Sequence, residues 1–218
     1  IFLVPAKVFF QFVEYPLQGE QQPLGPLDFL HEIYLLSEGV RRLPGLPGVW
    51  PGAADFLGVG GVLSVISGYL TNVSVIGLLL GPRDLVLVDE LSHNSIVVGA
   101  RGVKARMETY AHNDLDDLER LLHKHRADYG RVLICTDSLF SMDGDITDLP
   151  RLLDMKDAYD AWLLLDEAHS YGVLGATGRG LCEHFGEDPK RVEIAIGTLS
   201  KSFASSGGFV AANADVIE

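Results

Sequence analysis

The side chains that could do chemistry gather in four segments, each directly after an apolar run. The segments are Asp89–Ser95, Asp137–Asp145, Asp166–His169 and Gly197–Lys201. Together they hold imidazoles, carboxylates, hydroxyl groups and one lysine. Because a mostly parallel sheet binds its ligands beyond the carboxyl ends of its strands, we expect an active site where these segments meet.

A lysine at one strand end and an aspartate at another are the groups that a pyridoxal phosphate (PLP) site requires. Lys201 would form the Schiff base with the cofactor. Asp166 would pair with the pyridinium nitrogen and keep it protonated, which preserves the ring as an acceptor of electrons. Taken singly, Lys201 could be a solvent-exposed lysine and Asp166 a helix N-cap. The prediction therefore rests on their joint spacing.

The remaining parts of such a site are also present. Ser67-Gly68-Tyr69 stands at the start of a predicted helix over residues 69–80, where free backbone N–H groups and the helix dipole favour a phosphate. His93 could stack on the cofactor ring, and His169 could reach its phenolic oxygen. The other histidines gain no such support and are predicted to lie on the surface or on helix faces: His31, His112, His123, His125 and His184.

From about Ala53 onward, short Leu-rich or β-branched runs alternate with amphipathic segments, which is typical of an α/β fold with a mostly parallel sheet flanked by helices. The predicted strands are Asp84–Val88, Val103–Thr109, Val132–Cys135, Trp162–Leu165, Glu193–Ile196 and Gly208–Ala212. Further helices are predicted over residues 114–125, where Asn113 could cap the first turn, and over residues 148–159, entered through Pro150.

Residues 1–52 differ from the rest of the chain. Seven of the ten prolines fall within the first 51 residues, and residues 27–38 are the one plausible helix there. We expect an atypical Pro-rich stretch over residues 1–52 and a large, catalytic domain over residues 53–218. Because the first residue is Ile rather than Met, and no stop signal marks the last residues, we expect the chain to be part of something longer.

Composition limits the partners. A net charge of −13, from 17 Lys and Arg against 30 Asp and Glu, opposes binding to a phosphodiester backbone, so no nucleic acid is expected.

Two cysteines, Cys135 and Cys182, are too few for a disulfide framework and fit a reducing, cytoplasmic compartment. Residues 1–13 and 73–80 are too short or too interrupted for the roughly 20 apolar residues of a membrane span. The second run would be a buried helix.

Six motifs along about residues 53–213 resemble, in the right order, the α-oxoamine synthases. They are Ser-Gly-Tyr-Leu-Thr-Asn (67–72), Leu-Ser-His-Asn-Ser (91–95), Phe-Ser-Met-Asp-Gly-Asp (140–145), Asp-Glu-Ala-His (166–169), Gly-Arg-Gly (178–180) and Gly-Thr-Leu-Ser-Lys-Ser (197–202). This family, within the PLP-dependent class I and II aminotransferases, includes 8-amino-7-oxononanoate synthase, 2-amino-3-ketobutyrate CoA ligase, 5-aminolevulinate synthase and serine palmitoyltransferase. Similar domains occur in polyketide synthases. The resemblance implies a fold-type I large domain.

Carried over residue by residue, the resemblance assigns the groups around the cofactor ring. Lys201 would carry the cofactor, Asp166 would meet the ring nitrogen and His169 the ring oxygen. His93 would stack on the ring, and Ser141 would lie beside it. The four catalytic residues on this reading are Lys201, His93, Asp166 and His169.

The phosphate would be held by the backbone of Gly68 and Tyr69 and by the hydroxyl of Thr198. The sequence also departs mildly from the family, since Asp137 stands where Glu is frequent and Ser92 where Asn is common. The family's small C-terminal domain, with its Arg for the substrate carboxylate, has no counterpart in these 218 residues.

The implied activity is a PLP-dependent acyl transfer that condenses an amino acid with an acyl thioester of coenzyme A or of an acyl carrier protein. The amino acid would displace Lys201, which would then remove its α-proton, and the resulting carbanion would attack the thioester. His93 would orient the carboxylate or the thioester carbonyl. The family also implies a homodimer with its sites at the subunit interface.

Alternatives stay open at this point. A PLP-dependent aminotransferase shares the Lys, Asp and phosphate elements, and a non-catalytic fragment or pseudoenzyme would keep the fold, although the retained Lys201 argues against decay. The Asp-Glu-Ala-His box of helicases needs a phosphate loop with Gly before Lys upstream, whereas Lys201 follows Ser200 and lies downstream. A zinc site from His93, His169, Cys135 and Cys182 lacks zinc-motif spacing, so no metal is predicted.

Overall fold

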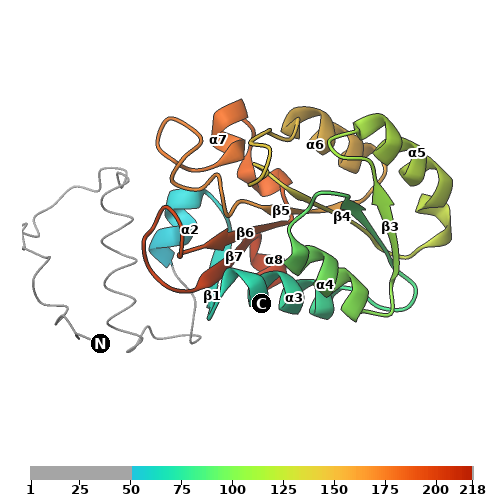
Figure 1. The fold of residues 1–218 in the computed structure, drawn as a ribbon, viewed down its shortest axis with the longest axis horizontal. Helices are drawn as coiled ribbons and strands as arrows, with labels where there is room; N and C mark the ends of the chain where they lie inside the picture. Colours follow the sequence, from blue (N-terminus) through green and yellow to red (C-terminus); the bar gives the residue numbers. More distant parts are fainter. Residues whose placement is uncertain (1–50, 218) are drawn as a thin grey trace, which may run out of the picture.

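A seven-stranded sheet lies between two layers of helices in the computed structural model, which describes residues 51–217 (Figure 1). The strand order is β1-β7-β6-β5-β4-β2-β3. Neighbouring strands are parallel, except that β7 runs antiparallel to both β1 and β6. The strands are β1 Gly61–Val65, β2 Leu85–Asp89, β3 Arg106–Tyr110, β4 Val132–Asp137, β5 Trp162–Asp166, β6 Ile194–Thr198 and β7 Gly208–Ala212. The predicted α/β fold with a mostly parallel sheet is confirmed.

The helices alternate with the strands along the chain. They are α2 Pro51–Leu57, α3 Gly68–Leu79, α4 Asn94–Gly102, α5 Leu115–His125, α6 Leu149–Ala158, α7 Leu181–Phe185 and α8 Ala214–Ile217, with short 3₁₀ helices at Arg126–Asp128 and Pro189–Arg191. Helices α5, α6 and α7 lie along one face of the sheet, and α3, α4 and α8 along the other (Figure 1).

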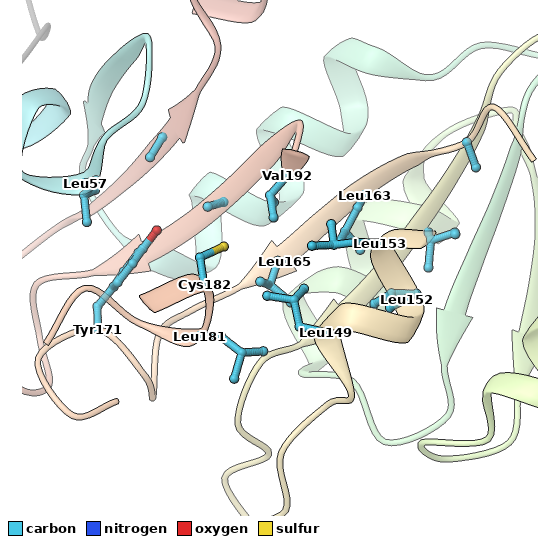
Figure 2. Packing of buried hydrophobic residues seen from close by; sticks show 14 of the residues in the cluster. Leu57, Leu149, Leu152, Leu153, Leu163, Leu165, Tyr171, Leu181, Cys182 and Val192 are labelled. Carbon is cyan, nitrogen blue, oxygen red and sulfur yellow. The ribbon is translucent and has the colours of Figure 1, made fainter. Parts of the chain in front are cut away.

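Both faces of the central strands are buried, because strand side chains point alternately to the two helix layers. On β2, Leu85 and Leu87 pack in the larger core, while Val86 and Val88 pack in the smaller one with Ile76 of α3. Figure 2 shows part of the larger core, where leucines of α6, β5 and α7 meet. This two-sided burial explains the continuous apolar runs of the sequence.

Aspartate side chains cap the N-termini of helices α5 and α6. Asp148 accepts a hydrogen bond from the Arg151 N–H at the start of α6, with proline in the first turn as predicted. At α5 the predicted cap Asn113 is wrong. Asp114 accepts the N–H groups of residues 116 and 117, while Asn113 adopts a left-handed φ of 51° that turns the chain into the helix. The carboxylate one residue further along is the better placed acceptor.

Other local predictions need correction. Strand β1 and helix α4 were not predicted, and β3 begins at Arg106 rather than Val103. The run over residues 73–80 was expected to be a buried helix, yet α3 buries few of its apolar side chains, and Leu78 is 86% exposed. Helix α3 is apolar on all sides, but residues 51–217 bury only part of its surface.

The predicted Pro-rich stretch over residues 1–52 and the predicted helix over residues 27–38 lie outside the described residues, apart from residues 51 and 52 at the start of α2. Within residues 51–217, the helices are all too short or too polar to cross a lipid bilayer.

Candidate active site

A cavity of about 250 Å³ opens at the carboxyl ends of β4, β5 and β6, beside the first residues of α3 and α4. The structure brings most of the predicted site residues to its lining: Gly68, Tyr69, His93, Asp166, His169, Thr198 and Lys201. These residues come from four separate segments that only the parallel sheet brings together. The cavity therefore has the position expected for ligand binding in an open α/β sheet.

Ser141 is not among the lining residues. It is exposed in the turn between Leu139 and Ile146, which form an isolated antiparallel bridge. The structure thus places this predicted site residue outside the cavity. Its loop nevertheless follows β4 directly and lies at the same edge of the sheet.

Asp166 is the buried anion of the cavity, with 4% of the residue exposed. Its Oδ2 accepts a hydrogen bond of 2.7 Å from the Asn72 side-chain amide, and its Oδ1 accepts one of 2.9 Å from the Ala168 N–H. Asn72 also donates to the Ser95 hydroxyl at 2.9 Å. Two donors from different elements therefore fix the orientation of the carboxylate.

Lys201 and His169 meet at the mouth of the cavity. The Lys201 Nζ lies 2.5 Å from the His169 Nε2. Partial burial lowers the pKa of Lys201, although the charges of Asp166 and Asp137 oppose the shift. Burial, and then the charge of Lys201, lower the pKa of His169. A neutral imidazole can accept from the lysine, so the contact holds the amine at the edge of the site.

The N-terminus of α3 forms another wall of the cavity. Ser67 caps the helix by accepting the Leu70 N–H at 3.2 Å. Gly68 lies against Thr198, since a Cβ at Gly68 would come within 3.1 Å of the Thr198 side chain. The lack of a side chain at Gly68 thus brings the helix N-terminus and the Thr198 hydroxyl to the same place, an arrangement suited to an anion.

His93 lies at the start of α4, where its Nδ1 accepts the Ser95 N–H and contacts the Ser95 hydroxyl at 2.7 Å. Its backbone N–H donates to the Asp137 Oδ2 at 3.0 Å. The Tyr69 ring meets the His93 ring edge-on, with centroids 6.4 Å apart. The side chain is exposed, so one face of the imidazole is open to a ligand.

Several lining residues were not predicted as parts of the site, among them the polar residues Asn72, Ser95 and Asp137. Asn72 stands four positions after Gly68, so both face the same side of α3, and this i, i+4 spacing is a signal the sequence contains. Asp137 is buried at the end of β4, and burial, with the nearby charge of Asp166, raises its pKa to about 8.

The Glu of the Asp-Glu-Ala-His motif points into the protein. Glu167 is buried, and its carboxylate accepts the Leu181 N–H at the start of α7 as well as the hydroxyl of Ser170. Burial raises its pKa to about 7. This side chain attaches the segment before α7 to the end of β5, and it has no access to a metal-bound nucleotide.

The four side chains weighed as a zinc site do not gather. Both thiols are buried and free, and burial raises their pKa above the ordinary value of 9.0. Within residues 51–217, one group of three side chains has potential ligand atoms within 4.8 Å of one another: His112, Asp143 and Asp145. Both ring nitrogens of His112 already contact carboxylates, so this group is not assigned as a metal site.

Known proteins resemble this chain in both sequence and structure. A putative 8-amino-7-oxononanoate synthase of Cyanothece sp. is 48% identical over 152 residues, which are 70% of this chain and 38% of that protein. Serine palmitoyltransferase 2 of Saccharomyces cerevisiae is 41% identical over 173 residues, 76% of this chain and 31% of that protein. The chain thus spans between about a third and two fifths of the length of these relatives.

Solved structures lead to the same family. A high-resolution structure titled as SPT with the PLP internal aldimine matches with a TM-score of 0.72 and 30% identity, over 85% of this chain and 49% of that one. Residues 53–218 match the family described as aminotransferase class I and II. The chain belongs to this aminotransferase family and, within it, to the α-oxoamine synthases, which the sequence motifs predicted.

Proposed function

We propose that this protein is a PLP-dependent acyltransferase that condenses an amino acid with an acyl thioester. The observation that carries the proposal is the cavity in which the Lys201 amine, the Asp166 carboxylate and the N-terminus of α3 meet. The donor set fits the cofactor, because an amine, a buried anion and an anion-binding helix end match its aldehyde, its ring nitrogen and its phosphate. The close approach of Gly68 to Thr198, where a Cβ would be only 3.1 Å from the threonine side chain, supports the same fit.

When bound, pyridoxal phosphate supplies an aldehyde that condenses with amines and a ring that takes up the electrons of a deprotonated amino acid. The protein's residues divide the remaining tasks. Asp166, held by Asn72 and Ala168, keeps a negative charge at the ring nitrogen. Thr198 and the N–H groups of Gly68 and Tyr69 would bind the phosphate.

Lys201 is placed to carry the cofactor and then to take the α-proton of the substrate. Its lowered pKa supports this role, since a larger share of the amine is neutral and able to attack a carbonyl or accept a proton. With the cofactor bound, His169 would meet the ring oxygen, and His93 would cover the ring and orient the substrate. Ser141 is left out of the proposal because it lies outside the cavity lining.

The acyl donor is a thioester of coenzyme A or of an acyl carrier protein. The similarity to 8-amino-7-oxononanoate synthase and serine palmitoyltransferase supports this substrate class over the amino-group acceptors of aminotransferases. A homodimer is part of the proposal. Three apolar side chains are exposed on or next to helix α3: Ile66, Leu70 and Leu78. This exposed apolar surface supports a second subunit on that side of the protein. The cytoplasm suits the two free thiols.

The cofactor step is tested by adding pyridoxal phosphate, reducing with borohydride and mapping the labelled peptide. We expect label on Lys201 and its loss in Lys201→Ala, while Lys104→Ala, which removes an exposed lysine away from the cavity, keeps it. Label on another lysine would contradict the site.

The reaction is tested with amino acids and acyl thioesters on the dimeric protein. Release of free thiol together with an amino ketone supports the proposal. Transfer of the amino group to a 2-oxo acid without thiol release would identify an aminotransferase instead. Asp166→Asn should retain cofactor but exchange the substrate α-proton with solvent much more slowly, because a neutral ring is a poor acceptor of electrons.

A further inference from the structure

His112 connects two segments that border the proposed site. Its Nδ1 lies 3.0 Å from the Asp89 Oδ1, and its Nε2 lies 2.7 Å from the Asp145 Oδ2. Asp89 ends β2 and opens the segment that leads to His93, whereas Asp145 ends the turn that carries Ser141. The side chain is 19% exposed, so His112 lies at the surface, as predicted, but is partly covered by these two segments.

The chemistry of the two contacts requires a charged ring. A neutral imidazole has a single N–H donor, whereas both partners here are carboxylate oxygens, which accept. Both hydrogen bonds are therefore made by the imidazolium form. Burial opposes the charge, but hydrogen bonds and charges from Asp89 and Asp145 outweigh it, so the pKa of His112 lies above its ordinary value of 6.5.

Neighbouring groups reinforce the same connection. The Asn113 N–H donates to the Asp89 Oδ2 at 2.8 Å, and its side-chain amide donates to the Asp145 Oδ2 at 2.7 Å. The His112 N–H donates to the Glu90 Oε1 at 3.0 Å. The buried Phe140 ring packs edge-on against the imidazole, with centroids 4.4 Å apart. The ring is thus held by both segments at once.

We propose that His112 is a positioning residue of the site, whose doubly hydrogen-bonded imidazolium holds residues 89–93 and the loop over residues 138–147 in one fixed arrangement. The carboxylates at the ring are Asp89 from the end of β2 and Asp143 and Asp145 from the loop, while Glu90 accepts the backbone N–H of His112. Loss of the proton removes one of the two bonds to the ring, so one carboxylate keeps the hydrogen bond from Asn113 but loses the charged partner. The inference rests on the proposed function only in treating these segments as parts of the site.

The first test uses the full chain without cofactor. Titration followed by NMR of the His112 ring should give a midpoint above that of a free histidine, about 6.5. His112→Gln keeps a donor for one carboxylate but carries no charge. We expect amide hydrogen exchange in residues 89–93 and 138–147 to rise about tenfold, the usual effect of losing a charge-assisted hydrogen bond at a partly exposed site.

The pH dependence of amide exchange distinguishes the proposed positioning role of His112 from a merely structural one. In the unsubstituted protein, exchange in the two segments should rise as the pH passes the His112 midpoint, after correction for the intrinsic rate, and His112→Gln should abolish that step. His123→Gln, on the exposed side of α5, is the matched control and should change neither segment. A midpoint at or below that of free histidine, or a uniform rise that includes β5, would overturn the inference.

A second variant guards against misfolding of the first. Asp145→Asn keeps a hydrogen-bond acceptor for the ring but removes its charge, so the His112 midpoint should fall. An unchanged midpoint contradicts the proposal. Cofactor attachment to Lys201 is measured separately. The predicted exchange pattern in a protein that takes up no cofactor would support the positioning role while contradicting the proposed function.

Discussion

Asp137 and Asp166 are register partners at the ends of β4 and β5, so two buried carboxyl groups stand side by side on neighbouring parallel strands. They are held by different donors. Asp166 accepts hydrogen bonds from Asn72 and Ala168, while Asp137 accepts one from the N–H of His93. Burial, followed by the charge of Asp166, raises the pKa of Asp137 to about 8. The low-dielectric surroundings and the neighbouring carboxyl group of Asp166 therefore both favour the protonated form of Asp137.

This pair predicts a pH dependence of stability. The pKa of Asp137 is raised above its unfolded value of 3.8, so folding favours the protonated form. The contribution of Asp137 to the free energy of unfolding is fully present below pH 4 and is lost as the pH rises toward 8. Asp137→Asn mimics the protonated carboxyl group and should be more stable than the unsubstituted chain at pH 9, by about 1–3 kcal/mol. Thermal unfolding at pH 5 and pH 9 measures the effect. A variant that is less stable at pH 9 would contradict it.

Asn72 should stabilise the fold by satisfying Asp166. Asn72→Ala removes a donor from a buried carboxylate and should lower the free energy of unfolding by about 1–3 kcal/mol. Asn72→Asp should cost more, because it adds a like charge beside Asp166. Ser74→Ala, at an exposed position of the same helix, is the control and should change little. Urea denaturation tests the ranking, and equal effects of Asn72→Ala and Ser74→Ala would refute it.

Most of the sheet could be predicted from sequence because strands buried on both faces are apolar along most of their length, as β2, β4, β5, β6 and β7 are. The edge strand β3 is largely polar and exposed, and its bounds were predicted less well. Strand β1 was missed for two physical reasons. Its residues, Gly61–Val65, follow closely on two glycines, and its pairing partner β7 lies about 150 residues further along the chain. Local composition therefore predicts a loop, and long-range antiparallel pairing makes it a strand.

The part of the candidate site that lies at strand ends could be predicted from the sequence. Asp166 and Lys201 directly follow apolar runs, and the structure brings both to one cavity. His112 was not predictable, because its partners stand 23 and 33 residues away and only the fold brings them to its ring. Ser141 was predicted as a site residue, but the fold places it elsewhere. A motif places it near the strand end, but the turn that carries it points outside the lining.

Gly197 should tolerate no side chain. A Cβ there would lie 2.1 Å from the Phe209 ring, which is itself stacked on Tyr171 with centroids 5.6 Å apart. Gly197→Ala should therefore destabilise the fold by about 1–3 kcal/mol or more through overpacking. Gly77→Ala in the middle of α3, where a Cβ meets nothing within 4 Å, is the matched control and should gain about 0.5–1 kcal/mol.

The clash has a specific rescue. Phe209→Leu in the Gly197→Ala background should recover part of the lost stability, since the smaller side chain frees the space that the new methyl group needs. Denaturant unfolding of the single and double variants gives the coupling. If the two substitutions are additive, the contact between Gly197 and Phe209 is not the cause of the loss.

Lys201 should react as an amine with a lowered pKa even before any cofactor is added. Burial is the first cause of that shift, and the negative charge of Asp166 partly opposes it. In competitive acetylation followed by peptide mapping, the pH midpoint of Lys201 labelling should lie below the ordinary value of 10.5. Asp166→Asn removes the opposing charge and should lower the midpoint further, whereas Asp215→Asn on α8 should leave it unchanged. A midpoint at or above the ordinary value, or a rise on Asp166→Asn, would show that neither burial nor Asp166 governs this amine.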